Sequence, residues 1–528
     1  MDKKLYITTP IYYPSAKLTL GNCYTTIVCD AISRFHKMMG YDVFFLTGTD
    51  EHGQKIEKVA KEKGVTEMEH LDAIVADTKQ LWKALDIDYN KFIRTTDDYH
   101  VEAVTKIFNK LYEKGEIYKT HYKGKYCTPC ESFWTDEQLV DGKCPDCGRD
   151  VYEADEECYN FRLSNYTDKI MELYKTNPEF LTPEARVNEM VKNFLEGGLK
   201  DLCVTRKSVK WGIPVSFDPD HTIYVWIDAL TNYLTALGYM SEDETNFKKF
   251  WPADIHVVGK EIVRFHAIIW PALLMALDIP LPHRIKGHGW LLYNNGKLSK
   301  SKEVGKKEIF DPRVLIERYG RDSVRNFIIG EIPFGGDGPY TQELFLNAFN
   351  TNLANTVGNL ASRTAGMIIK YNNAVLEKGA PATQEDEEFK KQVVALKQKS
   401  IETIKAFDPT TSYNSALAIL EACNKYIDDN KPWELAKDET QSERLKTFLY
   451  TLSEAQVEAY TLLLPFLTEK AQLVFANFGL EVPTTISETE HFNQLKPTQT
   501  VTKGENTYNR LDIKKEMEEL YAIANPQE

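Results

Sequence analysis

The feature that most constrains the fold is a strand, a helix and a second strand at the start of the chain. Residues 5–9 are rich in β-formers, 24–39 repeat apolar residues at helical spacing, and 41–46 form a nearly continuous apolar run. Such a run is typical of a strand buried on both faces of a parallel sheet. The succession therefore predicts a doubly wound α/β domain. Its ligands should bind beyond the carboxyl ends of the strands, at residues 8–14 and 47–53.

This α/β pattern brackets an insertion and is followed by helices. Composition becomes loop-rich after Gly115, and apolar strands return at 222–227 and 255–258, followed by a helix over 261–277. Beyond residue 340 apolar side chains repeat with a 3.6-residue period, which predicts an antiparallel helix bundle. We expect an α/β domain, an insertion, a linking region, the bundle and a polar tail or linker, with boundaries 1–114 and 222–292, 115–221, 293–340, 341–482 and 483–528.

Charge and composition exclude several classes of protein. The 528 residues carry 64 Lys and Arg against 78 Asp and Glu, a net charge of −14. Bulk attraction to nucleic acid is thereby excluded, although a local basic groove is not. No stretch approaches the roughly 18 apolar residues of a membrane span, and the N-terminus has no signal-peptide pattern. Nine cysteines are too few for a disulfide scaffold. We expect a cytoplasmic protein with reduced thiols and no membrane partner.

Four cysteines have the spacing of a metal site. Two Cys-x-x-Cys pairs are separated by thirteen residues, namely Cys127, Cys130, Cys144 and Cys147. Four thiolates at this separation predict one tetrahedral Zn²⁺. Since four protein ligands leave no open position, the ion would be structural. The alternative is a pair of disulfides or unrelated thiols.

Two further segments are suited to phosphate groups. In the first, Thr19, Gly21 and Asn22 lie at the start of a helix, where backbone N–H groups attract anions. In the second, residues 296–302 hold three lysines and two serines, a basic loop suited to a polyphosphate. Taken singly, each segment also fits a plain helix cap or a solvated surface loop.

Together the two segments resemble the signatures of the methionyl-tRNA synthetase family of class I, over about residues 1–480. The family's His-Ile-Gly-His and Lys-Met-Ser-Lys-Ser correspond here to Thr19-Leu20-Gly21-Asn22 and Lys297-Leu298-Ser299-Lys300-Ser301. Leucine replaces methionine at similar volume. Threonine and asparagine donate hydrogen bonds but cannot become imidazolium ions. The resemblance implies a Rossmann-like catalytic domain, a connective insertion with a zinc knuckle, and an all-α anticodon-binding bundle.

The resemblance also implies a role for each group of residues. The catalytic residues would be Lys300, Lys297, Thr19 and Asn22. ATP would be bound by Thr19, Gly21, Asn22, Gly259, Lys260, Glu261, Lys297, Ser299, Lys300 and Ser301. Methionine, whose thioether suits aromatic surroundings and whose ammonium suits a carboxylate, would be bound by Ile11, Tyr13, Asp50, Trp226, Ala229, Leu230, Tyr233, Phe265 and His266. The anticodon would be read by Asn359 and Arg363, which share a helix face, and stacked upon by Trp433.

The implied reaction has two steps. The methionine carboxylate attacks the α-phosphate of Mg²⁺-bound ATP, and a hydroxyl of the terminal adenosine of tRNA(Met) then attacks the adenylate. Because the first nucleophile is already an anion, catalysis should come from positioning and charge neutralisation. We expect a monomer, since the C-terminal OB-fold module of some relatives is absent.

Three alternatives remain open at this point. One is a class I synthetase for leucine, valine or cysteine, and another is a plain nucleotidyltransferase. The third is a catalytically inactive paralogue, a binding protein that depends on tRNA or on zinc. The altered segment from Thr19 to Asn22 supports that third alternative. The intact loop from Lys297 to Ser301 argues against it.

Overall fold

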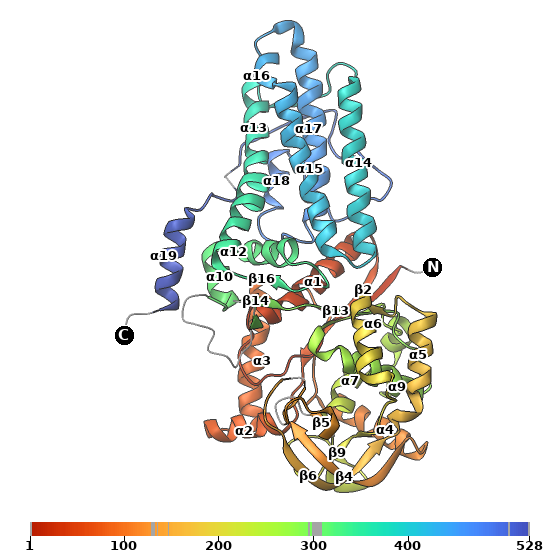
Figure 1. The fold of residues 1–528 in the computed structure, drawn as a ribbon. Helices are drawn as coiled ribbons and strands as arrows, with labels where there is room; N and C mark the ends of the chain where they lie inside the picture. The colour runs from red at the N-terminus through yellow and green to blue at the C-terminus, as the bar shows by residue number, and fades with distance from the viewer. Residues whose placement is uncertain are drawn as a thin grey trace.

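A six-stranded parallel sheet forms the centre of the α/β part (Figure 1). The computed structural model describes residues 3–127, 132–134, 136–145, 147–293, 296–297, 309–504 and 507–525. Along the sheet the strands are ordered β3 (Lys91–Arg94), β2 (Asp42–Thr49), β1 (Lys4–Thr8), β12 (Ile255–Gly259), β13 (Ile285–His288) and β7 (Leu181–Thr182). Strand order reverses beside β1, with β2 on one side and β12 on the other. A doubly wound sheet binds ligands at such a point.

Alternation along the first strands divides the core into two layers. Leu5 and Ile7 point into the layer built with α1 (Leu20–Met38) and α3 (Glu67–Ala84). Tyr6 points into the opposite layer, with α4 (Asp98–Glu113), α7 (Val225–Thr235) and α9 (Trp270–Ala276). Since successive strand side chains face opposite sides, a sheet covered by helices on both faces needs apolar residues at every position. The predicted doubly wound fold is confirmed.

The segment expected to be an insertion contributes both to its own sheets and to the central sheet. One sheet is ordered β5 (Ser132–Trp134), β4 (Ile117–Cys127), β6 (Tyr152–Phe161) and β8 (Leu202–Cys203), and a smaller one is ordered β10 (Pro214–Val215), β11 (Asp218–Ile223) and β9 (Thr205–Arg206). Helices α5 (Thr167–Thr176) and α6 (Glu184–Met190) flank β7 along the chain. The predicted strand 222–227 is wrong beyond Ile223, because α7 begins at Val225.

A linking region joins the sheet to the helices. It contains β14 (Leu291–Tyr293), β15 (Gly296–Lys297), β16 (Gly338–Pro339), α10 (Pro312–Tyr319) and α11 (Arg321–Asn326). The short helices α2 (Gln54–Lys63) and α8 (Thr245–Phe250) complete the α/β part.

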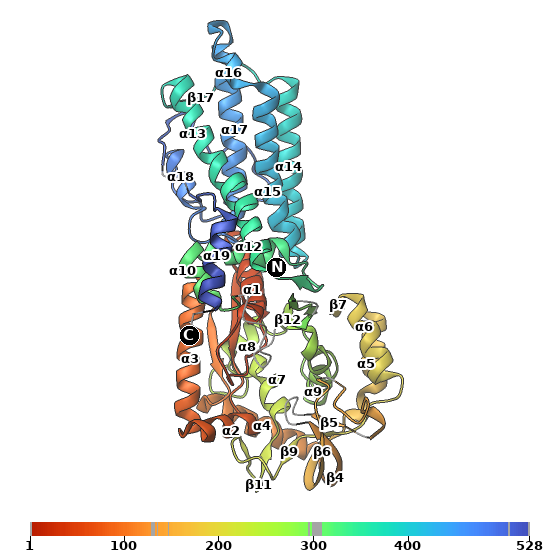
Figure 2. The ribbon, with the colours of Figure 1, turned by 60° about the vertical axis from the view of Figure 1, so that its left-hand side comes forward.

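The predicted helix bundle stands on one end of the α/β part, and β4, β5 and β6 lie at the opposite end (Figures 1 and 2). It consists of α12 (Gln342–Ala348), a π-helical stretch (Phe349–Gly358), α13 (Asn359–Asn372), α14 (Gln384–Lys405), α15 (Pro409–Asn430), α16 (Pro432–Leu435), α17 (Ser442–Leu463) and α18 (Leu473–Asn477). Its far end carries α16 (Figure 1). Among the described residues, no helix combines the length and apolar character needed to cross a membrane.

The polar tail packs along the bundle. Its strand β18 (Thr498–Thr500) pairs with β17 (Val375–Glu377), and the tail also forms the helix α19 (Ile513–Ala524). Buried carboxylates of α17 accept hydrogen bonds from tail backbone N–H groups: Glu458 from Phe492 at 2.9 Å and Glu454 from Leu495 at 3.1 Å.

Candidate active site

The start of α1 holds the altered signature in a closed hydrogen-bonded turn. The side-chain oxygen of Asn22 accepts from the backbone N–H of Thr19 at 3.0 Å and from its hydroxyl at 3.2 Å. Asn22 thereby satisfies the backbone N–H of Thr19, the residue that caps α1. These contacts also fix the Asn22 amide so that its nitrogen, a donor, lies at the positive end of the helix. The arrangement suits an anion without any imidazole.

The loop after β2 carries Asp50 and is clamped by its neighbours. Asp50 is buried, and its N–H donates to the carbonyl of Tyr12 at 3.0 Å, which places it beside the loop after β1. Next to it, the fully buried Glu51 accepts from Arg94 at 2.8 Å and from Thr96 at 2.5 Å. Charge-assisted bonds of this kind hold geometry strongly. The loop therefore presents Asp50 at the carboxyl edge of the sheet.

A buried carboxylate on α7 holds the other side of that loop. One oxygen of Asp228 bonds to Nδ1 of His52 at 2.7 Å, and the other bonds to Nε2 of His100 at 2.8 Å. His100 in turn bonds to the Thr235 hydroxyl at 2.7 Å. Burial alone would raise the pKa of Asp228, but the charge of His52 and the hydrogen bonds from both histidines outweigh it and lower the pKa to about 2. Asp228 thus ties the Asp50 loop to the helix of the expected methionine pocket.

The expected pocket residues of α7 and of the segment after β12 lie together. The rings of Trp226 and Phe265 stack with centroids 3.4 Å apart. Ile11 and Trp226 pack against the buried cluster that contains Ala229 and against the core that contains Leu230. Residues Phe265–Ile269 form a π-helical turn, a distortion common at functional sites. Tyr13 is half-buried, with Nζ of Lys55 5.7 Å from its ring centre.

His266 is held in one tautomer by two partners. Burial lowers its pKa to about 4, although a backbone hydrogen bond opposes the shift, so the ring is neutral at pH 7. Nδ1 lies 2.9 Å from the carbonyl of Ile262, which can only accept, and therefore carries the proton. Nε2 then accepts from the Tyr233 hydroxyl at 2.7 Å. Both ring nitrogens of His266 are therefore engaged within the protein.

The three residues expected to meet adenosine are tied to the linking region. Gly259 ends β12, and a side chain there would meet the Glu261 carboxylate at 2.5 Å. Nζ of Lys260 lies 2.7 Å from the Asp337 carboxylate, and the Trp290 indole N–H donates to Glu261 at 2.7 Å. This edge of the sheet is therefore bridged to the segments on either side of the basic loop.

Of the basic loop, Gly296 and Lys297 belong to the described residues. Ser299, Lys300 and Ser301 lie outside the described residues. The backbone of Lys297 belongs to β15 and pairs with Leu292 of β14. Lys297 therefore belongs to the small sheet of β14, β15 and β16, beside which Trp290 and Asp337 contact Glu261 and Lys260.

Three of the four predicted metal ligands converge. The sulfurs of Cys127, Cys144 and Cys147 all lie within 4.8 Å of one another, and those of Cys127 and Cys147 are 3.6 Å apart. Sulfurs around tetrahedral Zn²⁺ lie about 3.8 Å apart, because each Zn–S bond is about 2.3 Å. None of the described cysteines forms a disulfide. Cys130 lies outside the described residues.

The knuckle packs towards the pocket wall. Buried Trp134 contacts the cluster of Cys127 and Cys144, and the Arg264 guanidinium lies 4.7 Å from the Trp134 ring and 4.6 Å from the Phe265 ring. A second group that could hold a cation, Glu157 with Asp218 and His221, is already neutralised, since Lys207 and Lys119 lie 2.7 and 3.0 Å from Glu157.

The expected anticodon residues lie on the bundle. Asn359 is exposed and Arg363 is half-exposed on α13, and Arg363 reaches Asp428 of α15 at 3.4 Å. Trp433 lies on α16, at the far end, and is 38 % exposed. An exposed aromatic ring suits an unstacked base.

The sequence missed the residues that position the site. His52, His100 and Asp228 are separated by 48 and 128 residues, and nothing in their spacing marks them as partners. The same holds for Arg94 and Glu51. Buried hydrogen bonds between distant elements, and not local motifs, identify these residues.

Comparison with known proteins identifies the family of this chain. The family model "tRNA synthetases class I (M)" matches residues 5–158 and 149–365. The chain belongs to the class I tRNA synthetases. Within that class its curated relatives include a methionine–tRNA ligase of Caldanaerobacter subterraneus, 52% identical over 98% of this chain and 81% of the relative, and one of Clostridium acetobutylicum, 50% identical over 99% and 81%.

Solved structures give the same result. Mycobacterium tuberculosis methionyl-tRNA synthetase in complex with methionyl-adenylate matches with a TM-score of 0.91 and 37% identity, over 96% of this chain and 100% of that one. The apo form from the same organism matches with a TM-score of 0.84 and 34% identity, over 97% and 99%. The backbone described here is thus more similar to the adenylate complex.

Proposed function

We infer that this chain is a methionine–tRNA ligase, which activates methionine with ATP and transfers it to the terminal adenosine of tRNA(Met). The observation that carries the inference is the meeting of three elements at the carboxyl edge of one sheet. These are the capped start of α1, the clamped Asp50 loop after β2, and Gly259–Glu261 after β12. The near full-length identity to methionine–tRNA ligases supports the choice of amino acid.

Activation needs the α-phosphate of ATP held against a carboxylate nucleophile. We propose that Thr19, Gly21 and Asn22 bind phosphate oxygens at the start of α1, where the helix dipole favours negative charge. Lys300 and Lys297 neutralise the leaving pyrophosphate, with Ser299 and Ser301 beside them. Gly259, Lys260 and Glu261 contact the adenosine. Because the nucleophile is already an anion, positioning and charge neutralisation suffice.

Methionine recognition separates the ammonium from the thioether. Asp50 binds the ammonium, as its place at a strand end and its buried surroundings support. The thioether is received among aromatic and aliphatic side chains, which favour sulfur contacts; these are Ile11, Tyr13, Trp226, Ala229, Leu230, Tyr233, Phe265 and His266. His266 acts by orienting the Tyr233 hydroxyl, which donates to it.

The remaining roles concern tRNA and metal. Asn359 and Arg363 on α13 and Trp433 on α16 read the anticodon, and the acceptor end reaches the sheet. Cys127, Cys130, Cys144 and Cys147 hold one Zn²⁺, which supplies folding stability to the insertion and no catalytic step. Mg²⁺ enters with ATP. We propose that the protein acts in the cytoplasm, where tRNA is charged for translation. The monomeric state stays a prediction, which light scattering tests.

Charging of tRNA is the test of this function. Purified protein with ATP, Mg²⁺ and labelled methionine should charge a tRNA(Met) transcript and should leave a tRNA with replaced anticodon bases poorly charged. A folded, zinc-loaded protein that binds tRNA(Met) without charging it would instead be the inactive paralogue.

A further inference from the structure

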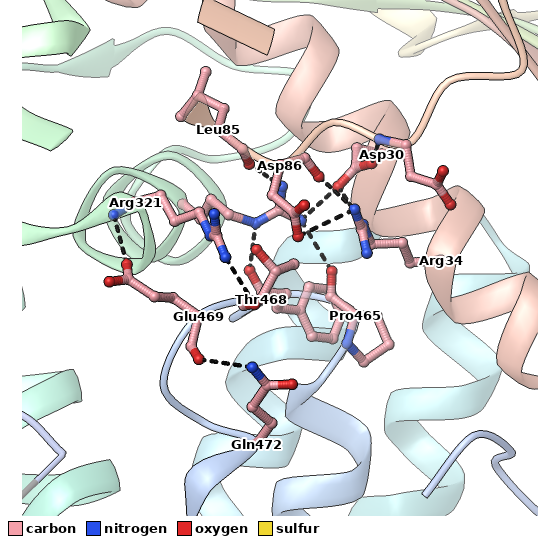
Figure 3. Close-up of polar contacts among 12 residues, drawn as sticks. Asp30, Arg34, Leu85, Asp86, Arg321, Pro465, Thr468, Glu469 and Gln472 are labelled. Carbon is pink, nitrogen blue, oxygen red and sulfur yellow. Dashed lines mark hydrogen bonds and ion pairs between the residues drawn. The ribbon is translucent and has the colours of Figure 1, made fainter. Parts of the chain in front are cut away.

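A buried ion pair joins the signature helix to the base of the bundle (Figure 3). Asp30 lies on α1, eight residues after Asn22, and Arg325 lies on α11. Nη2 of Arg325 is 2.7 Å from the Asp30 carboxylate, and both side chains are fully buried. The pair therefore lies where the sheet, the linking region and the bundle meet.

Arg325 also donates to backbone carbonyls of two other segments. Its Nε donates to the carbonyl of Phe466 at 2.7 Å and its Nη2 donates to that of Pro465 at 3.0 Å, just beyond the end of α17. Its Nη1 donates to the carbonyl of Leu85, which follows α3, at 3.3 Å. A planar guanidinium presents its donors in a fixed fork. One side chain thus sets the mutual placement of α1, α3 and the end of α17.

Neighbouring contacts also hold the α/β part on one side of this ion pair and the bundle on the other. On the α/β side, Asp30 accepts from Arg34 at 2.9 Å and from the N–H of Asp88 at 2.7 Å. On the bundle side, the backbone N–H of Arg321 donates to Glu469 at 2.9 Å, as Figure 3 shows. Asp322 accepts from the N–H groups of Glu469 and Lys470 at 3.0 and 2.8 Å. Segments 465–470 and 85–88 are therefore fixed on both sides of Arg325.

Stability alone is a poor explanation for such a pair. Taking two charges out of water costs free energy that their attraction repays only with good geometry, and apolar replacements are often as stable. What an ion pair with a donor fork gives, and an apolar contact does not, is a defined orientation. The contacts of Arg325 to three separate segments are of that kind.

We propose that Arg325, held by Asp30, is a positioning residue that sets the angle of the anticodon-binding bundle against the signature helix during tRNA charging. This rests on the proposed function. Helix α15 has 22 residues, and at 1.5 Å per residue it is about 33 Å long. A tilt of about 5° at its base moves the far end, which carries Trp433, by about 3 Å. A displacement of about 1 Å already lowers rates by up to about 100-fold.

The test separates the two steps of the reaction. Arg325→Met removes the guanidinium donors while keeping an unbranched side chain. Arg325→Lys keeps the charge but cannot donate to all three segments at once. We expect methionine-dependent ATP–pyrophosphate exchange within about twofold of wild type, because the catalytic edge is untouched. Charging of tRNA(Met) should fall by about 10- to 100-fold in kcat/KM. Charging of a tRNA with replaced anticodon bases should change little, so the ratio between the two tRNAs should fall at least about tenfold.

A matched control removes a buried ion pair elsewhere. Lys397 and Glu458 pair at 2.6 Å inside the bundle, with exposed fractions of 4% and 2%. Lys397→Met should lower stability without lowering the ratio between the two tRNAs. If Arg325 only stabilised the fold, its loss would lower ATP–pyrophosphate exchange and the charging of both tRNAs by the same factor.

The outcomes are distinct. A selective loss in either Arg325 variant supports the inference, and Arg325→Lys carries the test if Arg325→Met is insoluble. An unchanged tRNA ratio, a proportional loss of every activity, or an equal fall of the ratio in Lys397→Met would overturn it. Failure of the wild-type protein to charge tRNA(Met) would instead overturn the proposed function, and this inference with it.

Discussion

Replacement of Asp228 by Asn tests how the methionine site is held together. The carboxylate accepts hydrogen bonds from His52 at 2.7 Å and His100 at 2.8 Å, and it is 1% exposed. Asparagine keeps the shape but removes the charge, and its amide nitrogen cannot accept. Since His52 lies two residues after Asp50, loss of either bond loosens the loop that carries the proposed ammonium ligand.

The pKa of Asp228 sets the size of the effect. Its fall from the usual 3.8 to about 2 corresponds to about 2 kcal/mol of stability at pH 7, at 1.36 kcal/mol per unit. Because the pKa is lower in the folded state, this stability is present above pH 4 and is lost as the pH falls towards 2. We expect the free energy of unfolding of Asp228→Asn to fall by about 2–4 kcal/mol at pH 7, the upper figure including the unpaired partner.

Urea unfolding followed by tryptophan fluorescence, together with exchange kinetics, measures both consequences. The KM for methionine should rise by about tenfold while the KM for ATP stays within about twofold, since Asp228 holds His52 on the loop of the proposed ammonium ligand. Asp220→Asn, an exposed carboxylate on β11, is the matched control and should change neither quantity. Equal stability of Asp228→Asn and wild type at pH 7, or equal rises in both KM values, would refute this reasoning.

Three further predictions concern metal, anticodon and pH. Cys144→Ala should release the zinc, measured by elemental analysis, while the control Cys158→Ala should retain it. An unchanged zinc content in Cys144→Ala would contradict the predicted zinc site. Trp433→Ala should lower kcat/KM for charging tRNA(Met) by about 10-fold or more, since stacking on a base is worth about 1–3 kcal/mol, and should leave pyrophosphate exchange intact; loss of both steps together would contradict its anticodon role. Burial lowers the pKa of His266 from 6.5 to about 4, so the neutral ring stabilises the fold fully above pH 6.5 and about 3 kcal/mol of this stability is lost by pH 4. In His266→Gln the free energy of unfolding should therefore change less between pH 6.5 and 4, and a pH dependence identical to that of the wild type would contradict a buried, neutral His266.

The central sheet was predictable because its first strands are apolar on both faces. Leu5, Tyr6 and Ile7 are all buried, as a strand covered by helices on both sides requires. The pattern failed after Ile223, where aromatic and β-branched residues form α7. Strand preference in such residues reflects packing on a half-buried surface, and here Trp226 packs on Phe265 instead.

The packing of the tail and the partners of Asp228 and Asp30 could not be predicted from the sequence, because they depend on residues far away in the chain. Polarity after residue 482 predicted a tail or linker, but Glu454 and Glu458 hold its backbone along α17. Asp228 and Asp30 read as ordinary helix residues, and only the fold brings His52 and Arg325 to them. Motifs report residues that meet ligands, whereas the residues that position them carry no local signal.

The central claim is that this sheet edge activates methionine. Amino-acid-dependent ATP–pyrophosphate exchange, run without tRNA on all twenty amino acids, tests it most directly. We expect strong exchange with methionine alone. Exchange with another amino acid would keep the class I chemistry and contradict the methionine pocket proposed for Trp226, Tyr233 and Phe265. No exchange from folded, zinc-loaded protein would contradict the activation chemistry itself.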